Sequence, residues 1–183
     1  MKTVVLGVTG SIAAYKACEL VRLFVKGGYD VHVVMTAHAT EFVTPLTFRT
    51  LSRNPVPTAL FGPADEWRPG HISLAEAADL VVVAPATANI LAKMAHGIAD
   101  DLLSSILLAT KAPIVVAPAM NTGMYESPAT QANFAALKAR GVRFVEMGEG
   151  ELACGTIGVG RMAEPEDIFN ECQCPLSMVG TGR

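Results

Sequence analysis

Short, continuous apolar runs alternate with longer amphipathic stretches along most of this chain. The runs are rich in valine and other β-branched residues, and they occupy residues 3–8, 30–35, 80–84, 113–117 and 142–145. Apolar runs without polar alternation are typical of strands covered on both faces. Because helical patterns separate these runs, a parallel crossover is the default connection between consecutive strands. The pattern therefore predicts an α/β fold with a parallel sheet.

The amphipathic stretches predict helices between the strands. One helix is expected over residues 12–26, where charged residues share one side and glycines end the pattern. Two helical stretches joined at Gly97 are expected over 89–109, and Asp100 and Asp101 give the second an acidic N-terminus.

Further helices are expected after Ser127 and Pro128 and again from Glu164. We assign residues 1–169 to one domain and residues 170–183, which lack clear periodicity, to a C-terminal tail.

Composition narrows the class of protein. The chain has 183 residues, of which 51% are hydrophobic and 17% charged, and this excludes a disordered chain. A net charge of −3 without a basic tract argues against nucleic acid as a partner. No apolar run reaches the roughly 18 residues of a membrane helix. A strand pattern, and not the pattern of a signal peptide, follows Met1 and Lys2 directly. We therefore expect a cytoplasmic protein without membrane contact, whose four cysteines are reduced.

Small and polar residues follow two of the predicted strands. Residues 85–89 come after the run at 80–84, and residues 118–125 come after the run at 113–117. Ligands bind at the carboxyl edge of parallel sheets, because strand ends and helix N-termini converge there. Each turn carries an asparagine, Asn89 or Asn121, that a simple loop does not require. We expect a cofactor and substrate site at this edge.

The turn after the first strand carries Gly10 and Ser11. Backbone N–H groups and the Ser11 hydroxyl suit a phosphate here. This turn is not a G-x-G-x-x-G fingerprint, because it holds a single glycine. A tight turn in which Ser11 only caps the helix is an equally good interpretation of these residues.

His71 lies ahead of a short predicted helix at 74–78. Taken alone, a capping or surface histidine is the commoner interpretation, and catalysis is the alternative. His32, His38 and His96 have no convergent partners in the sequence, so we assign them to structure.

The proline-rich residues 52–70 predict a long surface segment with one short strand at 56–60. A loop of this length usually has a function or packs on a neighbour.

A glycine-rich stretch spans residues 148–162, with five glycines in fifteen residues. It cannot form a stable helix or a central strand, so it predicts a flap or a loop with demanding backbone angles. Cys154 at its centre suits a reactive thiol, and a buried structural cysteine is equally compatible with the composition. Cys172 and Cys174 lack the spacing of a zinc site, and no metal is expected.

Taken together, these segments resemble one family: the homo-oligomeric, flavin-containing cysteine decarboxylases, in particular those of coenzyme A biosynthesis. The match runs in order and spacing from about Thr3 to Ile168. Any one motif is weak, but the ordered set is specific. It comprises residues 9–16, 35–42, 70–72, 84–89, 97–104, 118–125 and 153–162.

The resemblance implies a Rossmann-like, flavodoxin-type three-layer sandwich that binds FMN without a covalent bond. It implies that the phosphate end lies near Gly10, Ser11 and Thr36. The full set of implied cofactor contacts is Gly10, Ser11, Ile12, Thr36, Phe42, Pro85, Ala86, Thr87, Ala88, Asn89 and Ala119.

The resemblance also implies an enzyme, a carboxy-lyase acting on 4'-phosphopantothenoylcysteine. Oxidation of the substrate thiol to a thioaldehyde supplies an electron sink beta to the carboxylate. Loss of CO2 then gives an enethiol, and this is reduced to 4'-phosphopantetheine. By the same resemblance, His71 is the catalytic base, Asn121 and Met124 bind substrate, and Cys154 donates a proton from a covering flap. The implied assembly is a homotrimer, often built further into a dodecamer, with the site between subunits.

Two residues depart from the family pattern within the domain. Tyr125 stands where tryptophan is common, a mild change that keeps an aromatic ring, and Ile90 stands where threonine is common, which removes one hydroxyl near the flavin. Many bacterial members continue into a synthetase domain, so the chain suits either a monofunctional enzyme or part of a bifunctional one. Three other functions stay open: a peptidyl-cysteine decarboxylase of lantibiotic maturation, a flavin prenyltransferase, and a non-catalytic regulatory relative. The pairing of Pro118–Asn121 with the Cys154 stretch favours the coenzyme A enzyme.

Overall fold

The computed structural model describes residues 1–60, 70–151, 155 and 157–173. Five parallel strands form its main sheet, in the order β2-β1-β3-β4-β5. The strands are β1 (Thr3–Val8), β2 (Asp30–Met35), β3 (Leu80–Ala86), β4 (Ile114–Pro118) and β5 (Arg143–Phe144). The α/β prediction and each of the five predicted strands are confirmed.

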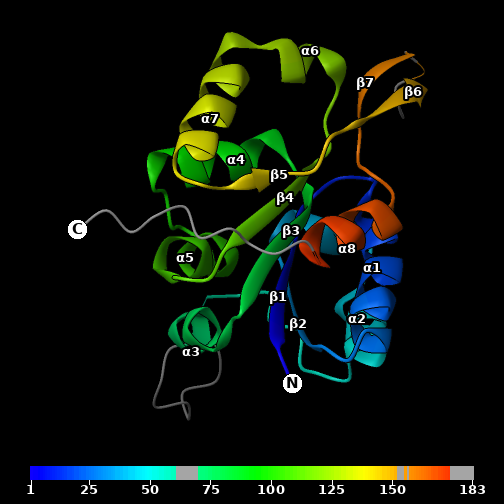
Figure 1. The fold of residues 1–183 in the computed structure, drawn as a ribbon, viewed down its shortest axis with the longest axis vertical. Helices are drawn as coiled ribbons and strands as arrows, with labels where there is room; N and C mark the ends of the chain where they lie inside the picture. Colours follow the sequence, from blue (N-terminus) through cyan, green and yellow to red (C-terminus); the bar gives the residue numbers. More distant parts are fainter. Residues whose placement is uncertain (61–69, 152–154, 156, 174–183) are drawn as a thin grey trace.

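Helices cover both faces of this sheet (Figure 1). Helices α1 (Ala14–Lys26), α2 (Pro45–Ser52) and α8 (Pro165–Gln173) pack on one face. The other face carries α3 (Gly70–Ala77), α4 (Ala88–His96), α5 (Leu102–Ala109) and α7 (Pro128–Ala139). Two short elements lie at the carboxyl edge, the 3-10 helix η1 (Ala37–Glu41) and α6 (Thr122–Glu126).

Alternation along the strands divides the core into two layers. In β1, Val4, Leu6 and Val8 belong to the cluster under α1, whereas Val5 belongs to the cluster under α5. Gly7 lets α5 approach the sheet closely, because a Cβ atom there would lie 2.5 Å from a methyl carbon of Leu103. The three-layer arrangement thus follows from strands that are apolar on both faces.

Most helix boundaries follow local signals. Gly97, with a φ of 70°, ends α4, and Asp101 caps α5 in a reciprocal capping box with Ser104. The break predicted at Gly97 is therefore confirmed. Helix α8 continues to Gln173, so the border expected at residue 169 falls inside a packed helix in which Cys172 is buried.

Three expectations need correction. The strand predicted at 56–60 does not form within the described residues, where Pro57 only accepts one hydrogen bond from Met35 N–H (3.3 Å). Pro85 and Ala86, expected in a turn, are the last residues of β3. The glycine-rich stretch forms part of a separate antiparallel pair, β6 (Gly148–Glu151) with β7 (Ile157–Arg161).

None of the helices in the described parts of the chain is long and apolar enough to cross a bilayer.

Candidate active site

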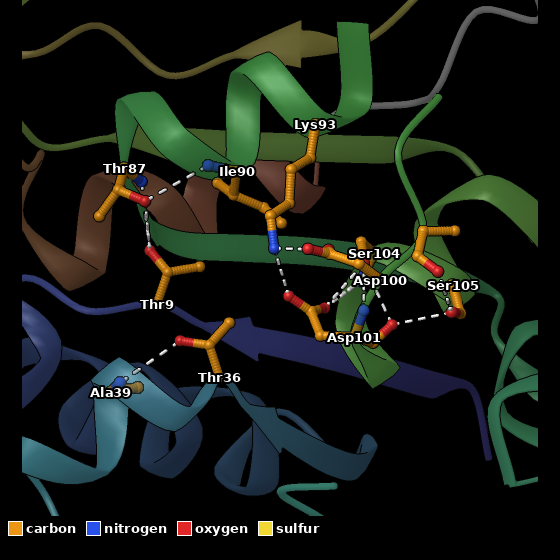
Figure 2. Close-up of polar contacts among 11 residues, drawn as sticks. Thr9, Thr36, Ala39, Thr87, Ile90, Lys93, Asp100, Asp101, Ser104 and Ser105 are labelled. Carbon is orange, nitrogen blue, oxygen red and sulfur yellow. Dashed lines mark hydrogen bonds and ion pairs between the residues drawn. The ribbon is translucent and has the colours of Figure 1, made fainter. Parts of the chain in front are cut away.

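The carboxyl ends of β1 and β3 are joined through one threonine side chain (Figure 2). The Thr9 hydroxyl donates to the carbonyl oxygen of Pro85 (2.7 Å) and accepts from the backbone N–H of Thr87 (3.2 Å). Thr9 is 2% exposed, so these bonds satisfy a hydroxyl that would otherwise be buried alone. The connection fixes the loop after β1 against the loop after β3.

Two further threonines start the helical turns at the same edge. The Thr36 hydroxyl accepts from Ala39 N–H (3.3 Å) at the start of η1, and the Thr87 hydroxyl accepts from Ile90 N–H (3.4 Å) at the start of α4. Each is an N-cap that satisfies a backbone donor left open at a helix start. Both helical starts therefore open toward the edge where the sequence predicted a site.

A cavity of about 550 Å³ lies between these loops. A volume in this range suits a small-molecule cofactor or substrate. Five of the residues expected in the site line it: Gly10, Thr36, Thr87, Asn89 and Met124. The remaining lining residues are Thr9, Ala37, His38, Thr58, Ala59, Leu60, Ile90, Lys93, Asp100, Asp101 and Leu102.

The loops after β1 and β2 meet at Gly10. A Cβ atom on Gly10 would lie 2.4 Å from the Cβ of His38, so a larger residue would force these loops apart. His38, which the sequence gave no partner, consequently lines the cavity. Only the fold shows this, because Gly10 follows β1 whereas His38 lies in η1, after β2.

The other expected cofactor contacts are not among the residues that line the cavity. Ser11 accepts a hydrogen bond from Ala13 N–H (3.3 Å) within the turn, but the N-cap of α1 is Ala13, so the capping role considered for Ser11 is wrong. Ile12 and Phe42 are 56% and 49% exposed. Ala119 N–H donates to the carbonyl oxygen of Ala86 (3.0 Å), while Pro85 lies in β3 and Ala88 begins α4.

A charged cluster that the sequence did not reveal lines the cavity at Lys93, Asp100 and Asp101. Figure 2 shows the ion pairs that hold it together. Lys93 Nζ lies 2.6 Å from Asp100 Oδ1 and 2.8 Å from Asp101 Oδ2. Lys93 is on α4 and both aspartates precede α5, so the ion pairs span the turn at Gly97. The sequence indicates Asp100 and Asp101 as helix-start residues within the 97–104 motif, but not that they pair with Lys93.

The cluster sets the charge state of its members. Burial by itself raises the pKa of the Asp101 carboxyl, but hydrogen bonds from Lys93 and Ser104 outweigh it and hold that pKa below its ordinary value. Burial by itself lowers the pKa of Lys93, but hydrogen bonds to Asp100 and Asp101 outweigh it and keep that pKa above its ordinary value. One cation and two carboxylates leave this cluster with a net negative charge, so an anionic group is favoured at the opposite, threonine-rich end.

Asn121 is the N-cap of α6. Its side-chain oxygen accepts from Gly123 N–H (2.8 Å), and its backbone oxygen accepts from Tyr125 N–H (3.0 Å). Because the amide oxygen accepts this bond, the amide NH2 is the group that the turn orients as a donor. Met124, on the same short helix, lines the cavity, whereas Asn121 does not.

The two other expected catalytic residues differ in what the structure describes. His71 lies in the first turn of α3 and is half-buried, and its buried Nδ1 has no hydrogen-bond partner among the described residues. It does not line the cavity. Cys154 lies outside the described residues.

Comparison with known proteins gives concordant matches. The protein-family model described as Flavoprotein matches residues 1–175. The Coenzyme A biosynthesis bifunctional protein CoaBC of Haemophilus influenzae is 50% identical over 168 residues, covering 92% of this chain and 42% of that protein. The chain thus spans less than half the length of this curated relative.

Solved structures are also similar. A Cys-to-Ser variant of PPC decarboxylase complexed with pantothenoylaminoethenethiol superposes with a TM-score of 0.85 at 32% identity, covering 93% of this chain and 96% of that one. The FMN binding protein AtHal3 superposes with a TM-score of 0.82 at 32% identity, covering 93% and 94%.

Proposed function

This chain belongs to the Flavoprotein family, and on that basis we propose that it binds FMN and decarboxylates 4'-phosphopantothenoylcysteine to 4'-phosphopantetheine. The observation that carries the proposal is the similarity to a solved PPC decarboxylase over nearly the whole of both chains. The CoaBC relative points to the same pathway, coenzyme A biosynthesis.

The residues at the cavity fit FMN. Its threonine-rich end offers hydroxyl groups and the starts of two helical turns, which suit a phosphate and a polyol chain. The apolar side chains of Leu60, Ile90 and Leu102 line the same cavity and suit a flat aromatic ring. Of the contacts assigned to FMN in this proposal, Gly10, Thr36, Thr87 and Asn89 have direct access to the cavity.

The flavin, when bound, supplies the two-electron acceptor that lets the substrate thiol become a thioaldehyde. The chain's own residues then bind the substrate and manage protons. Asn121 donates its amide NH2 to the substrate carboxylate, and it stays neutral, so it does not hold that group as firmly as a full cation would. Loss of CO2 from a group held in this way is correspondingly easier.

Two residues handle protons in the proposal. His71 accepts the thiol proton during oxidation, and a ring nitrogen without a hydrogen-bond partner among the described residues suits that role. Cys154 returns a proton to carbon after CO2 has left. A Cys-to-Ser variant of a PPC decarboxylase was solved with an enethiol compound, which is the species that accumulates if a cysteine proton donor is missing.

A homotrimer, which can build further into a dodecamer, and a cytoplasmic location are part of the proposal. His71 does not line the cavity of a single chain, which suits a site completed by a second copy. Exposed apolar residues are available for a contact between copies: Ile12 (56% exposed), Tyr15 (60%), Phe42 (49%) and Leu46 (69%).

The test is a visible absorption spectrum of the purified protein, followed by 4'-phosphopantothenoylcysteine and mass analysis. A flavin spectrum with release of CO2 and 4'-phosphopantetheine is the expected result. A flavin spectrum without turnover on this substrate would overturn the assigned reaction, and peptides ending in cysteine would then be the next substrates. Failure to bind added FMN would overturn the cofactor assignment.

A further inference from the structure

The glycine-rich strand β7 is attached to the turn that carries Asn121. The Thr122 hydroxyl donates to the carbonyl oxygen of Val159 (2.8 Å), and Met120 N–H donates to the carbonyl oxygen of Gly160 (3.0 Å). The two sequence neighbours of Asn121 thus each bond one carbonyl group of β7, and these two carbonyl groups belong to consecutive residues. A change in the position of β7 therefore acts on the Asn121 turn from both sides.

The contact is close enough to require glycine on β7. A Cβ atom on Gly158 would lie 2.5 Å from Thr122 Oγ1, a distance that real Cβ contacts do not reach. Gly158 pairs with Gly150 in the antiparallel ladder, so β7 is held by β6 on one edge and by the Asn121 turn on the other. Threonine and glycine are therefore matched across this contact.

We propose that Thr122 is a positioning residue that fixes β7 against the Asn121 turn, and that this attachment decides whether bound substrate is carried through to the reduced product. The inference rests on the proposed function, in which Asn121 holds the substrate carboxylate and Cys154, shortly before β7 in sequence, returns a proton. Loosening the attachment affects the second half of the reaction more than the first.

The two halves leave different products. In the first half the substrate would lose a hydride, for which bound FMN would supply the two-electron acceptor, and its thiol proton would pass to the protein before its carboxylate leaves as CO2. In the second half the enethiol takes up a proton on carbon and the hydride returns to it. If the enethiol leaves early, it has two hydrogens fewer than 4'-phosphopantetheine, and the two electrons stay on the flavin until dioxygen removes them.

The experiment compares Thr122→Val, which lacks the hydroxyl at nearly the same shape, with Thr122→Ser, which keeps it. Each holoenzyme is mixed with one equivalent of 4'-phosphopantothenoylcysteine without dioxygen, and the products are separated by mass. We expect the enethiol fraction to rise roughly three- to tenfold in Thr122→Val, the factor that one lost hydrogen bond implies, and to return toward wild type in Thr122→Ser.

Two further variants complete the test. Gly158→Ala breaks the same contact from the other side and is expected to give the same enethiol excess. Thr50→Val removes a threonine hydroxyl that bonds Leu46 within α2, far from β7 in sequence, and is expected to leave the product ratio unchanged.

A second readout does not depend on turnover. The Met120 amide hydrogen, bonded to Gly160, is expected to exchange with deuterium faster in Thr122→Val than in wild type or in Thr122→Ser. If the wild type releases no CO2, the proposed function is wrong, and exchange still tests the attachment. An unchanged exchange rate in Thr122→Val would overturn the inference. If the wild type turns over, the same product ratio in Thr122→Val as in the wild type would also overturn it.

Discussion

Thr9 and Pro85 lie 76 positions apart in the sequence, yet the Thr9 hydroxyl donates to the Pro85 carbonyl oxygen over 2.7 Å. The same hydroxyl accepts from Thr87 N–H, so one side chain joins the loops that border the cavity on two strands.

Thr9→Val tests this connection. The variant leaves a buried carbonyl oxygen and a partly buried N–H without their partner, which costs about 1–3 kcal/mol of unfolding free energy. We also expect weaker FMN binding, because the two loops lose their fixed spacing. Chemical denaturation and flavin fluorescence quenching measure the two effects. Thr9→Ser, which keeps the hydroxyl, should recover both, and equal losses in the two variants would contradict the hydrogen-bond explanation.

The Lys93 cluster predicts a loss of stability in acid. Because the pKa of the Asp101 carboxyl is lowered in the folded protein, its stabilising effect is complete above the ordinary aspartate pKa of about 3.9. It is lost as the pH falls through the lower, folded value. The unfolding free energy of the wild type should therefore fall more steeply between about pH 5 and pH 3 than that of Asp101→Asn.

Lys93→Met is the matched variant for this cluster. It removes the cation and leaves the two carboxylates without their shared counter-ion. Because Asp100 is largely exposed, the unfolding free energy should fall by only about 1–2 kcal/mol near neutral pH. Its unfolding free energy should also fall less steeply than that of the wild type as the pH is lowered from about 5 to 3. The same slope in the wild type, Asp101→Asn and Lys93→Met would show that another group controls stability at low pH.

His71→Asn should abolish decarboxylation while flavin stays bound. A missing proton acceptor lowers the rate by about 10²- to 10⁴-fold, whereas the cavity residues that are assigned to FMN are unchanged. The absorption spectrum and CO2 release report the two properties separately. His96→Asn, at the exposed end of α4, is the matched control and should keep full activity. Normal turnover in His71→Asn would remove His71 from the mechanism.

Cys172 should resist alkylation in the folded protein. Burial raises the pKa of its thiol to about 12, so the reactive thiolate is roughly 10³-fold scarcer near pH 8 than at an ordinary cysteine. Labelling with iodoacetamide followed by peptide mapping should show slow modification of Cys172 when folded and fast modification in denaturant. Rapid labelling of the folded protein would mean that α8 detaches readily from the core.

Local sequence signals determined the elements and their class. Strand runs that are apolar on both faces indicated a covered parallel sheet, and Gly97 marked a helix end because glycine adopts its positive φ without strain. The cavity also lies at the carboxyl edge where the sequence predicted a site, since parallel strands bring their ends together. The resemblance to flavin-containing decarboxylases rested on ordered motifs of the same local kind.

Only the tertiary structure decided which side chains meet. The bond from Thr9 to Pro85, the ion pairs of Lys93 across the Gly97 turn, and the contact of Thr122 with Val159 all join separate elements. The strand expected at 56–60 did not form, because a β-rich pattern needs a partner strand, and Pro57 offers β2 only one bond. Periodicity reports the burial of each element, whereas contacts between elements depend on how the layers pack, which no single stretch of sequence encodes.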